Sequence, residues 1–335
     1  MRLMSIVEAT PATGLGRLAR SLAVAEALRE QGHEVVLTGD MELPAAIAIA
    51  EESGEVVVAG DHSPVGLARV AEEQGAERVL VDCAAYPDGL ADLLAARGVR
   101  TACFRDSLNG SHTATGVDLV IAPAWSPVSS VDVAADGSVR ATGPDYAPVR
   151  VAAREAAERR ESRAGGMGDR PRLLVLLGDG RRAEAMLPVA QWVANSDVSA
   201  DVLCVGGTDT QRRRAEVQST RRVRILATGW RPDLPRLVAD HDLVVSFGRR
   251  FSWEVACIGT PMALLAVSPA DVPALEATAD VGAAIWLGRP GDAQSPAGRL
   301  RTAIRDGMRR REVATQASRL VDGGGAARVA ELLTR

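Results

Sequence analysis

Residues 3–20 read LMSIVEATPATGLGRLAR, and this stretch decides the fold. It opens with an apolar run at 3–7, which is typical of a strand buried on both faces. A turn containing Gly14 and Gly16 follows, and then apolar residues recur with helical spacing from Leu15 to Leu28. A strand, a glycine turn and a helix in this order predict the first unit of an α/β sheet.

The same alternation continues to about residue 125. Helical patterns lie near 45–52, 65–74 and 89–97, between short apolar runs that read as strands. This order predicts a parallel sheet with helices on both faces. The predicted strands are 3–7, 34–38, 55–59, 78–82, 101–104 and 118–122.

A second block of alternation begins after residue 170. Residues 125–145 are rich in Pro, Ser and Gly and predict a loop, a helix is predicted over 149–163, and AGGMGDRP at 164–171 is a cluster of helix breakers. The tail at 296–335 is predicted helical, with a break at the Gly323–Gly325 run. The predicted strands of this second block are 173–177, 200–205, 223–227, 243–246, 262–266 and 284–287.

We therefore predict an α/β protein of two Rossmann-like parallel-sheet domains facing a central cleft. Residues 1–148 form the first domain, 149–170 a helix and linker, and 171–335 the second domain. A length of 335 residues suits two domains, and 47% apolar with 24% charged residues suits two packed cores. Ligands of such sheets bind beyond the carboxyl ends of the strands.

Composition narrows the possible functions. A net charge of −4 and only 3% aromatic residues argue against a nucleic-acid partner. All 39 basic residues are Arg, so Schiff-base and P-loop lysine chemistry are excluded. The sequence contains no CxxC, HExxH or GxSxG, so neither a metal site nor a serine hydrolase is expected. No apolar run reaches 18 residues, and the first one stops at Glu8, so we expect no membrane span, no signal peptide and a cytoplasmic location.

The turn after the first strand is the first candidate site. Gly14 and Gly16 allow a tight turn, after which the helix presents free N–H groups to an anion or a sugar oxygen. A plain strand-to-helix turn is the alternative interpretation. A dinucleotide site is disfavoured, because Ala19 occupies the third position of the GxGxxG pattern.

The segment SFGRRFSWEVACIGTP at 246–261 is the second candidate site. Gly248 turns the chain, and a helix predicted to begin near residue 251 places Glu254 in its first turn. Glu254 then either matches the helix dipole or accepts hydrogen bonds from a ribose diol. Arg249 and Arg250 stand where a phosphate would meet the helix end, or they are ordinary surface charges.

Two more loops follow strands of the second domain. GDGRR at 178–182 is a turn that begins at Gly178. TGWRPD at 228–233 places Trp230 where a nucleotide base would lie, or at the edge of the core.

Several motifs together resemble those of the UDP-sugar hydrolases of pseudaminic acid biosynthesis and the spore-coat polysaccharide glycosyltransferases, which belong to the GT-B superfamily. GLGRLARSLAVA at 14–25 is similar to GxGHxxRxxxLA, and GPDYAPVR at 143–150 to GPxYAxLR. DGGGAARV at 322–329 is similar to DGxGAxRI. Shorter matches are Val81-Asp82 with Tyr86, RDSL at 105–108, and SWEVACIGTP at 252–261.

The resemblance implies a GT-B enzyme that acts on a nucleotide sugar, with UDP as the default nucleotide, without a metal or another cofactor. The sugar and the acceptor would lie on the first domain. The nucleotide would lie on the second domain, with Glu254 on the ribose. The sugar-side residues are Gly14, Gly16, Arg17, Arg20, Asp82, Tyr86, Asp106 and Tyr146. The nucleotide-side residues are Gly178, Trp230, Gly248, Arg249, Arg250, Ser252 and Glu254.

The chain differs from the family at the position of the residue that the resemblance implies to be catalytic. The family's His after GxG is Arg17 here, and an arginine stays protonated and cannot act as a general base. We therefore favour transfer of the sugar to an unidentified acceptor other than water. Arg17, Arg249 and Arg250 would stabilise the leaving diphosphate, and Asp82, Asp106 or the leaving phosphate would take the proton. A hydrolase with another water-activating group and a catalytically silent binding partner are the alternatives.

Overall fold

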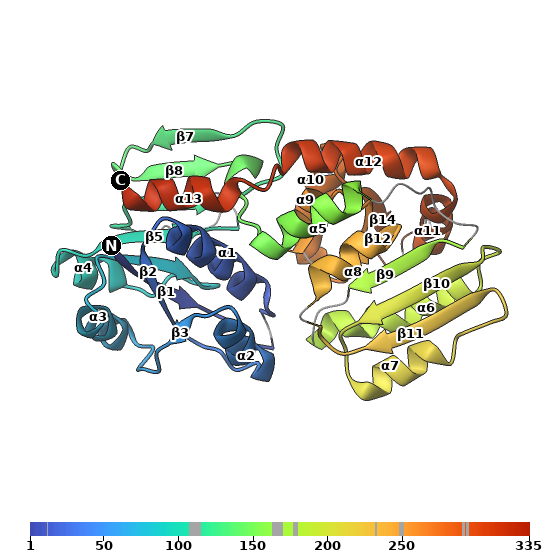
Figure 1. Ribbon diagram of the computed structural model, residues 1–335, viewed down its shortest axis with the longest axis horizontal. Helices are drawn as coiled ribbons and strands as arrows, with labels where there is room; N and C mark the ends of the chain where they lie inside the picture. The colour runs from blue at the N-terminus through green and yellow to red at the C-terminus, as the bar shows by residue number, and fades with distance from the viewer. Residues whose placement is uncertain are drawn as a thin grey trace. The chain divides into compact units, whose positions relative to one another are not determined.

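The computed structural model describes residues 1–11, 13–106, 115–162, 170–176, 180–231, 233–247, 251–289, 292 and 295–335. The chain divides into two compact units, each built on its own sheet (Figure 1). Unit 1 comprises Met1–Val151 with Gly323–Arg335, and unit 2 comprises Ala152–Asp322. Among the described helices, none is both long and apolar enough to cross a bilayer.

The sheet of unit 1 has the strand order β3-β2-β1-β4-β5-β6-β8-β7, and all its neighbours are parallel except the β7–β8 pair. The predicted parallel α/β arrangement of this half is confirmed. Its strands are β1 Arg2–Val7, β2 Glu34–Thr38, β3 Val56–Val57, β4 Arg78–Asp82, β5 Arg100–Phe104, β6 Leu119–Ala122, β7 Ser130–Val133 and β8 Val139–Thr142. Its helices before residue 150 are α1 Gly16–Glu30, α2 Pro44–Glu52, α3 Pro64–Glu73, α4 Leu90–Ala95 and the 3-10 turn η1 Pro144–Tyr146.

The prediction of a loop over residues 125–145 was wrong. Strand β8 pairs in parallel with β6, with Val139 opposite Leu119, and β7 closes the sheet as an antiparallel edge strand. All four β7 residues are exposed, so the strand lacks the apolar alternation that would have revealed it. Its pairing partners, which come from elsewhere in the chain, decide its conformation.

Unit 2 carries six parallel strands in the order β11-β10-β9-β12-β13-β14. This is the 3-2-1-4-5-6 order of a Rossmann-like sheet. Its strands are β9 Arg172–Leu176, β10 Ala200–Val205, β11 Val223–Thr228, β12 Leu243–Ser246, β13 Met262–Leu265 and β14 Ile285–Gly288. Its helices are α5 Val151–Glu161, α6 Met186–Ala194, α7 Asp209–Glu216, α8 Leu234–Asp240, α9 Phe251–Ile258, α10 Val272–Asp280, α11 Pro296–Arg305 and α12 Gly307–Leu320, with the 3-10 turns η2 Gly180–Ala185 and η3 Pro269–Asp271.

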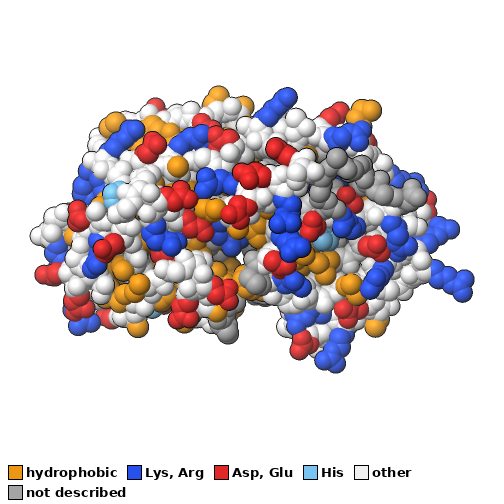
Figure 2. All heavy atoms as spheres, in the orientation of Figure 1, with side chains coloured by type: hydrophobic (Ala, Val, Ile, Leu, Met, Phe, Trp, Pro, Cys, Tyr) orange, Lys and Arg blue, Asp and Glu red, His pale blue; other side chains and the backbone are white. Residues whose placement is uncertain are grey.

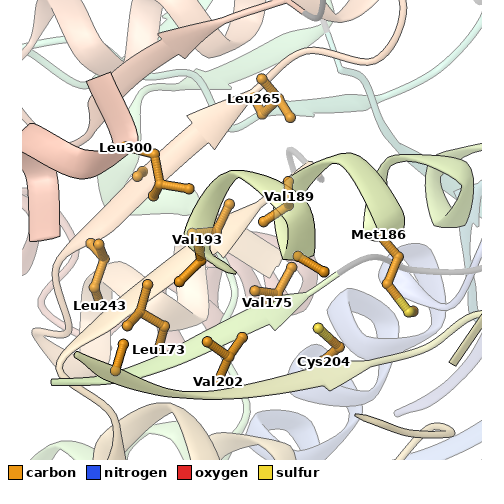
Figure 3. Packing of buried hydrophobic residues seen from close by; sticks show 14 of the residues in the cluster. Leu173, Val175, Met186, Val189, Val193, Val202, Cys204, Leu243, Leu265 and Leu300 are labelled. Carbon is orange, nitrogen blue, oxygen red and sulfur yellow. The ribbon is translucent and has the colours of Figure 1, made fainter. Parts of the chain in front are cut away.

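The core of unit 2 forms where helices α6 and α11 cover one face of its sheet. Figure 3 shows strand side chains such as Val175 and Val202 pointing toward Val189 and Val193 of α6. Leu300 of α11 packs against the same cluster. Inward-facing aliphatic side chains at these positions are what the apolar runs of the sequence predict.

The last helix, α13 Gly325–Thr334, packs within unit 1. It lies alongside α1 (Figure 1), with Val329 and Leu333 fully buried, and Arg328 Nη1 donates to the Asp145 carbonyl at 3.1 Å. Because its apolar face packs there, residues 323–335 belong to unit 1, whereas the sequence predicted a second domain over 171–335. The predicted tail helix is also interrupted before α12, where Asp306 accepts a hydrogen bond from the Arg309 N–H at 2.9 Å.

Both signs of charge cover the surface. Blue arginine and red acidic side chains are interspersed over both units on the face shown in Figure 2, in keeping with 39 basic and 43 acidic residues. Exposed pairs such as Arg69–Glu73 and Arg231–Asp233 connect neighbouring positions. Exposed pairs contribute at most about 1 kcal/mol each to the free energy of unfolding. Breaking a buried ion pair costs more, because it leaves an unpaired charge inside the protein.

Gly325→Ala should destabilise unit 1. A Cβ at this position would lie 2.1 Å from the Ala147 carbonyl oxygen, and a backbone atom cannot rotate away. We expect a loss of about 1–3 kcal/mol in the free energy of unfolding, measured by urea denaturation. The matched control is Gly324→Ala, whose Cβ meets only the flexible end of Arg328. Equal stability of the two variants would contradict the packing of α13.

Candidate functional site

Charged side chains converge at the carboxyl ends of β1, β4 and β5 in unit 1. Glu8 follows β1, Asp82 is the last residue of β4, and Asp106 lies just beyond β5. These strands are neighbours in the sheet, and the chain order reverses between β1 and β4. That reversal is the topological switch point where α/β sheets bind ligands.

Helix α1 brings two arginines to this edge. The N–H groups of Thr13 and Gly14 donate to the Thr10 carbonyl, and Gly14 adopts φ +69°, a conformation that favours glycine. The helix begins at Gly16, as the glycine pattern predicts. Arg17 and Arg20 are three residues apart and therefore share one side of its first turns.

The Arg20–Asp82 pair is the most buried part of the site. Arg20 Nε donates to Asp82 Oδ2 at 2.8 Å, and Nη2 donates to the other carboxylate oxygen. Asp82 is fully buried and Arg20 is 7% exposed. The guanidinium also lies over the Phe104 ring, 4.3 Å from its centroid. Burial alone would lower the pKa of Arg20, but the carboxylates of Asp82 and Asp106 raise it above the ordinary arginine value.

Arg17 lies among three carboxylates without hydrogen-bonding any of them. Its Nη1, Nε and Nη2 atoms are 3.7 Å from Glu8, 3.7 Å from Asp82 and 3.8 Å from Asp106. The side chain is 7% exposed, and its Nε and Nη1 atoms are buried without a hydrogen-bond acceptor among the described residues. Buried donors of this kind are costly unless something accepts from them. Arg17 is thus a buried group with hydrogen-bonding capacity to spare.

We name Glu8, Arg17, Arg20, Asp82 and Asp106 the arginine–carboxylate cluster. Two arginines and three carboxylates leave it one negative charge in excess. The Glu8 and Asp106 side chains, 21% and 32% exposed, reach solvent. The cluster therefore offers both hydrogen-bond donors and acceptors to a polar ligand. The sequence analysis missed Glu8, although its position one residue beyond an apolar strand was a usable signal.

The two predicted tyrosines lie apart from the cluster. The Tyr86 ring packs against the apolar core beneath β4 and β5, and burial raises the pKa of its hydroxyl well above the ordinary value. Tyr146 belongs to η1, which packs against α13. Among the described residues, no hydrogen bond joins either tyrosine to Arg17 or Arg20, so their role on the sugar stays a prediction.

The structure describes three of the predicted nucleotide-side residues of unit 2, namely Trp230, Ser252 and Glu254. Helix α9 begins at Phe251 and holds Glu254 in its first turn, as predicted. Ser252 and Glu254 are buried, at 0% and 4% exposure, and Trp230 is half-buried after β11. Burial first, then the Glu254 carboxylate, raises the pKa of Cys257 to about 11. Gly178, Gly248, Arg249 and Arg250 lie outside the described residues.

Comparisons with known proteins place the chain by its fold. No known protein family and no curated protein matches its sequence. The structure resembles MurG of Acinetobacter baumannii over 99% of both chains, with a TM-score of 0.68 and 15% identity. It also resembles the spinosyn rhamnosyltransferase SpnG (TM-score 0.66, 16% identity) and the UDP-GlcNAc 2-epimerase of Neisseria meningitidis bound to UDP-GlcNAc (TM-score 0.63, 12% identity), each over 100% of both chains. The chain therefore has the GT-B fold, and at these identities the likeness concerns the fold alone.

Arg20→Ala should destabilise the protein strongly. It would leave the buried Asp82 carboxylate without its counter-charge, which costs about 3–5 kcal/mol in comparable pairs. Urea unfolding measures the loss. As a control, Arg20→Leu combined with Asp82→Leu removes both charges and should recover much of it. A single variant as stable as the parent would refute the pairing.

Proposed function

We propose that this protein is a glycosyltransferase that moves a sugar from a nucleoside diphosphate sugar, with UDP as the nucleotide, to a hydroxyl-bearing acceptor. One observation carries the proposal: Arg17, Arg20 and Asp82 are buried at the carboxyl edge of the sheet, in a chain that matches solved glycosyltransferases along its whole length. Buried charges at a switch point are expensive to keep, and such groups are expected where a ligand uses them.

Within this proposal, the cluster binds the sugar and stabilises charge. Arg17 donates its spare hydrogen bonds to ligand oxygens and stabilises negative charge on the leaving diphosphate. Asp106, which reaches solvent, accepts a hydrogen bond from a sugar or acceptor hydroxyl. Asp82 is a positioning residue, because both its oxygens are occupied by Arg20 and it is fully buried. Gly14 and Gly16 let the backbone approach the sugar.

The nucleotide is proposed to bind unit 2 at the start of α9. Glu254 would accept hydrogen bonds from the ribose hydroxyls, and Ser252 would stand beside the phosphates. Gly178, Gly248, Arg249 and Arg250 complete the proposed phosphate side, with Trp230 at the base. Two structural relatives support a nucleotide ligand, since one is complexed with thymidine diphosphate and another with UDP-GlcNAc. No metal or other cofactor is invoked.

The product of the reaction distinguishes this proposal from its two alternatives. The purified chain is incubated with a panel of nucleotide sugars, with and without hydroxyl-bearing acceptors, and the products are identified by mass spectrometry. Glycosylated acceptor supports the transferase. Free sugar formed without acceptor identifies a hydrolase. Thermal stabilisation by nucleotide sugars without turnover identifies a silent binding protein.

Arg17→Ala should lower the rate of transfer by roughly a hundredfold, because one buried donor to developing charge is removed. The loss should be larger at low salt, where charge interactions are less screened. Arg236→Ala on α8, which removes an exposed arginine paired with Asp240, is the control. Arg17→His should also reduce transfer; an increase in hydrolysis instead would favour the hydrolase, since His accepts a proton near pH 7.

Glu254→Ala should weaken binding of a nucleoside diphosphate by about ten- to a hundredfold, the value of one charge-assisted hydrogen bond. Isothermal calorimetry measures the affinity. Exposed Glu276 on α10 provides the matched control, Glu276→Ala. Unchanged affinity in a folded Glu254→Ala protein would rule out the ribose contact.

A further inference from the structure

A histidine–aspartate pair lies on the same carboxyl edge, outside the arginine–carboxylate cluster. Asp40 follows β2 and His62 follows β3, and the His62 Nδ1 atom contacts Asp40 Oδ1 within hydrogen-bond distance. A carboxylate only accepts hydrogen bonds, so Nδ1 carries the proton toward it and Nε2 keeps its lone pair. A carboxylate that holds an imidazole in this tautomer makes a proton acceptor of the other nitrogen.

Both residues of the pair are held by local structure. Asp61 accepts hydrogen bonds from the Ser63 N–H at 2.9 Å and from its hydroxyl at 2.6 Å, and the Ser63 hydroxyl caps α3 by accepting from the Gly66 N–H. Gly66 has no room for a side chain, because a Cβ there would lie 2.4 Å from the Asp61 carbonyl oxygen. On the other strand, the Asp40 carbonyl accepts from the Ala9 N–H at 2.8 Å. The short loop before α3 therefore presents His62 in a defined place.

The pair lies beside the arginine–carboxylate cluster. The strand order β3-β2-β1-β4-β5 places His62, Asp40, Glu8, Asp82 and Asp106 in succession along one edge, with about 5 Å between neighbouring strands. The Ala9 hydrogen bond joins Asp40 to the residue that follows Glu8. The Cys83 thiol senses charges of both the pair and the cluster. Burial is the main cause that raises its pKa to about 12; the charges of Asp82, Glu8 and Asp40 also raise it, and Arg17 lowers it.

The other described histidines are not available for this role. His33 lies near the N-terminal amine, 3.5 Å from it, at the opposite end of the sheet. His241 belongs to unit 2, where its ring contacts the Leu237 carbonyl and burial lowers its pKa. His112 lies outside the described residues. Arg17 stays protonated and cannot accept a proton, so a base for the proposed transfer has to come from another residue.

We propose that His62, oriented by Asp40, is the general base that deprotonates the acceptor hydroxyl; this inference rests on the proposed glycosyl transfer. The acceptor O–H proton passes to His62 Nε2 while the acceptor oxygen bonds to the anomeric carbon. The bond from that carbon to the phosphate oxygen breaks, and the nucleoside diphosphate leaves with the electron pair. The residues of the arginine–carboxylate cluster then bind the sugar and stabilise charge, and they take no proton.

Several charged groups lie near the imidazole of His62. Asp40 and the adjacent Asp61 face it, Arg69 of α3 acts on the same loop, and Glu8 lies one strand beyond Asp40. The side chain of His62 is 35% exposed, so substrate and solvent reach it. A general base must be unprotonated to accept the acceptor's proton, so transfer should fall as pH decreases.

The test measures kcat/KM for transfer between pH 5 and 9 in His62→Gln, Asp40→Asn, Asp106→Asn and the control His33→Gln, with melting curves for each. We expect His62→Gln to lose about 100- to 10,000-fold and to lose the acidic limb of the profile. Asp40→Asn should lose less and keep the limb. Asp106→Asn should lower the rate with the limb in place, and His33→Gln should match the parent.

Several outcomes would overturn the inference. Parent-like activity and an unchanged profile in folded His62→Gln would remove His62 from the reaction while leaving the proposed transfer intact. Loss of the acidic limb in Asp106→Asn, but not in His62→Gln, would assign the base to Asp106. Absence of transfer in the parent chain with every nucleotide sugar would overturn the proposed function itself and the base with it.

Discussion

The buried ion pair between Arg20 and Asp82 is the constraint on which the site depends. It ties the first turns of α1 to the end of β4, on the side of β1 where the strand order reverses. Neither charge could remain there alone, since an unpaired buried charge costs several kcal/mol. Because Arg20 occupies both oxygens of Asp82, the neighbouring Arg17 is left among carboxylates that it does not hydrogen-bond. We propose that the unused N–H groups of Arg17 donate hydrogen bonds to a ligand.

The carboxyl edge of unit 1 thereby acquires two kinds of chemistry. Arg17, Arg20 and Asp82 of the arginine–carboxylate cluster are buried and supply fixed charges, which suit recognition and charge stabilisation. The Asp40–His62 pair is more exposed and supplies an imidazole, which we propose as the proton acceptor. One sheet edge can carry both, because parallel strands end side by side and each contributes the residue that follows it. Arg17 stays protonated and cannot accept a proton, which is why we assign that role to His62, two strands away.

The sequence alone determined the fold well, and for a physical reason. Apolar runs of four to six residues, such as 3–7 and 78–82, alternate with helical patterns, and a parallel sheet buried on both faces leaves no other arrangement for them. The glycine turn before α1 and the place of Glu254 in the first turn of α9 also follow from local rules. Strands β7 and β8 and the packing of α13 on unit 1 could not be predicted in this way, because partners far along the chain decide them.

For the site, the sequence determined which residues follow the strands, and only the tertiary structure decided which of them meet. Arg17, Arg20, Asp82 and Asp106 were predicted on the sugar side of the first domain, without their contacts, and their ion pairs follow from the strand order β1-β4-β5. Tyr86 follows β4 as well, yet its ring packs into the core, since the chain direction after a strand is set by packing and not by spacing. Asp40 and His62 are 22 positions apart and carry no motif; they became a pair because β2 and β3 are neighbours in the sheet.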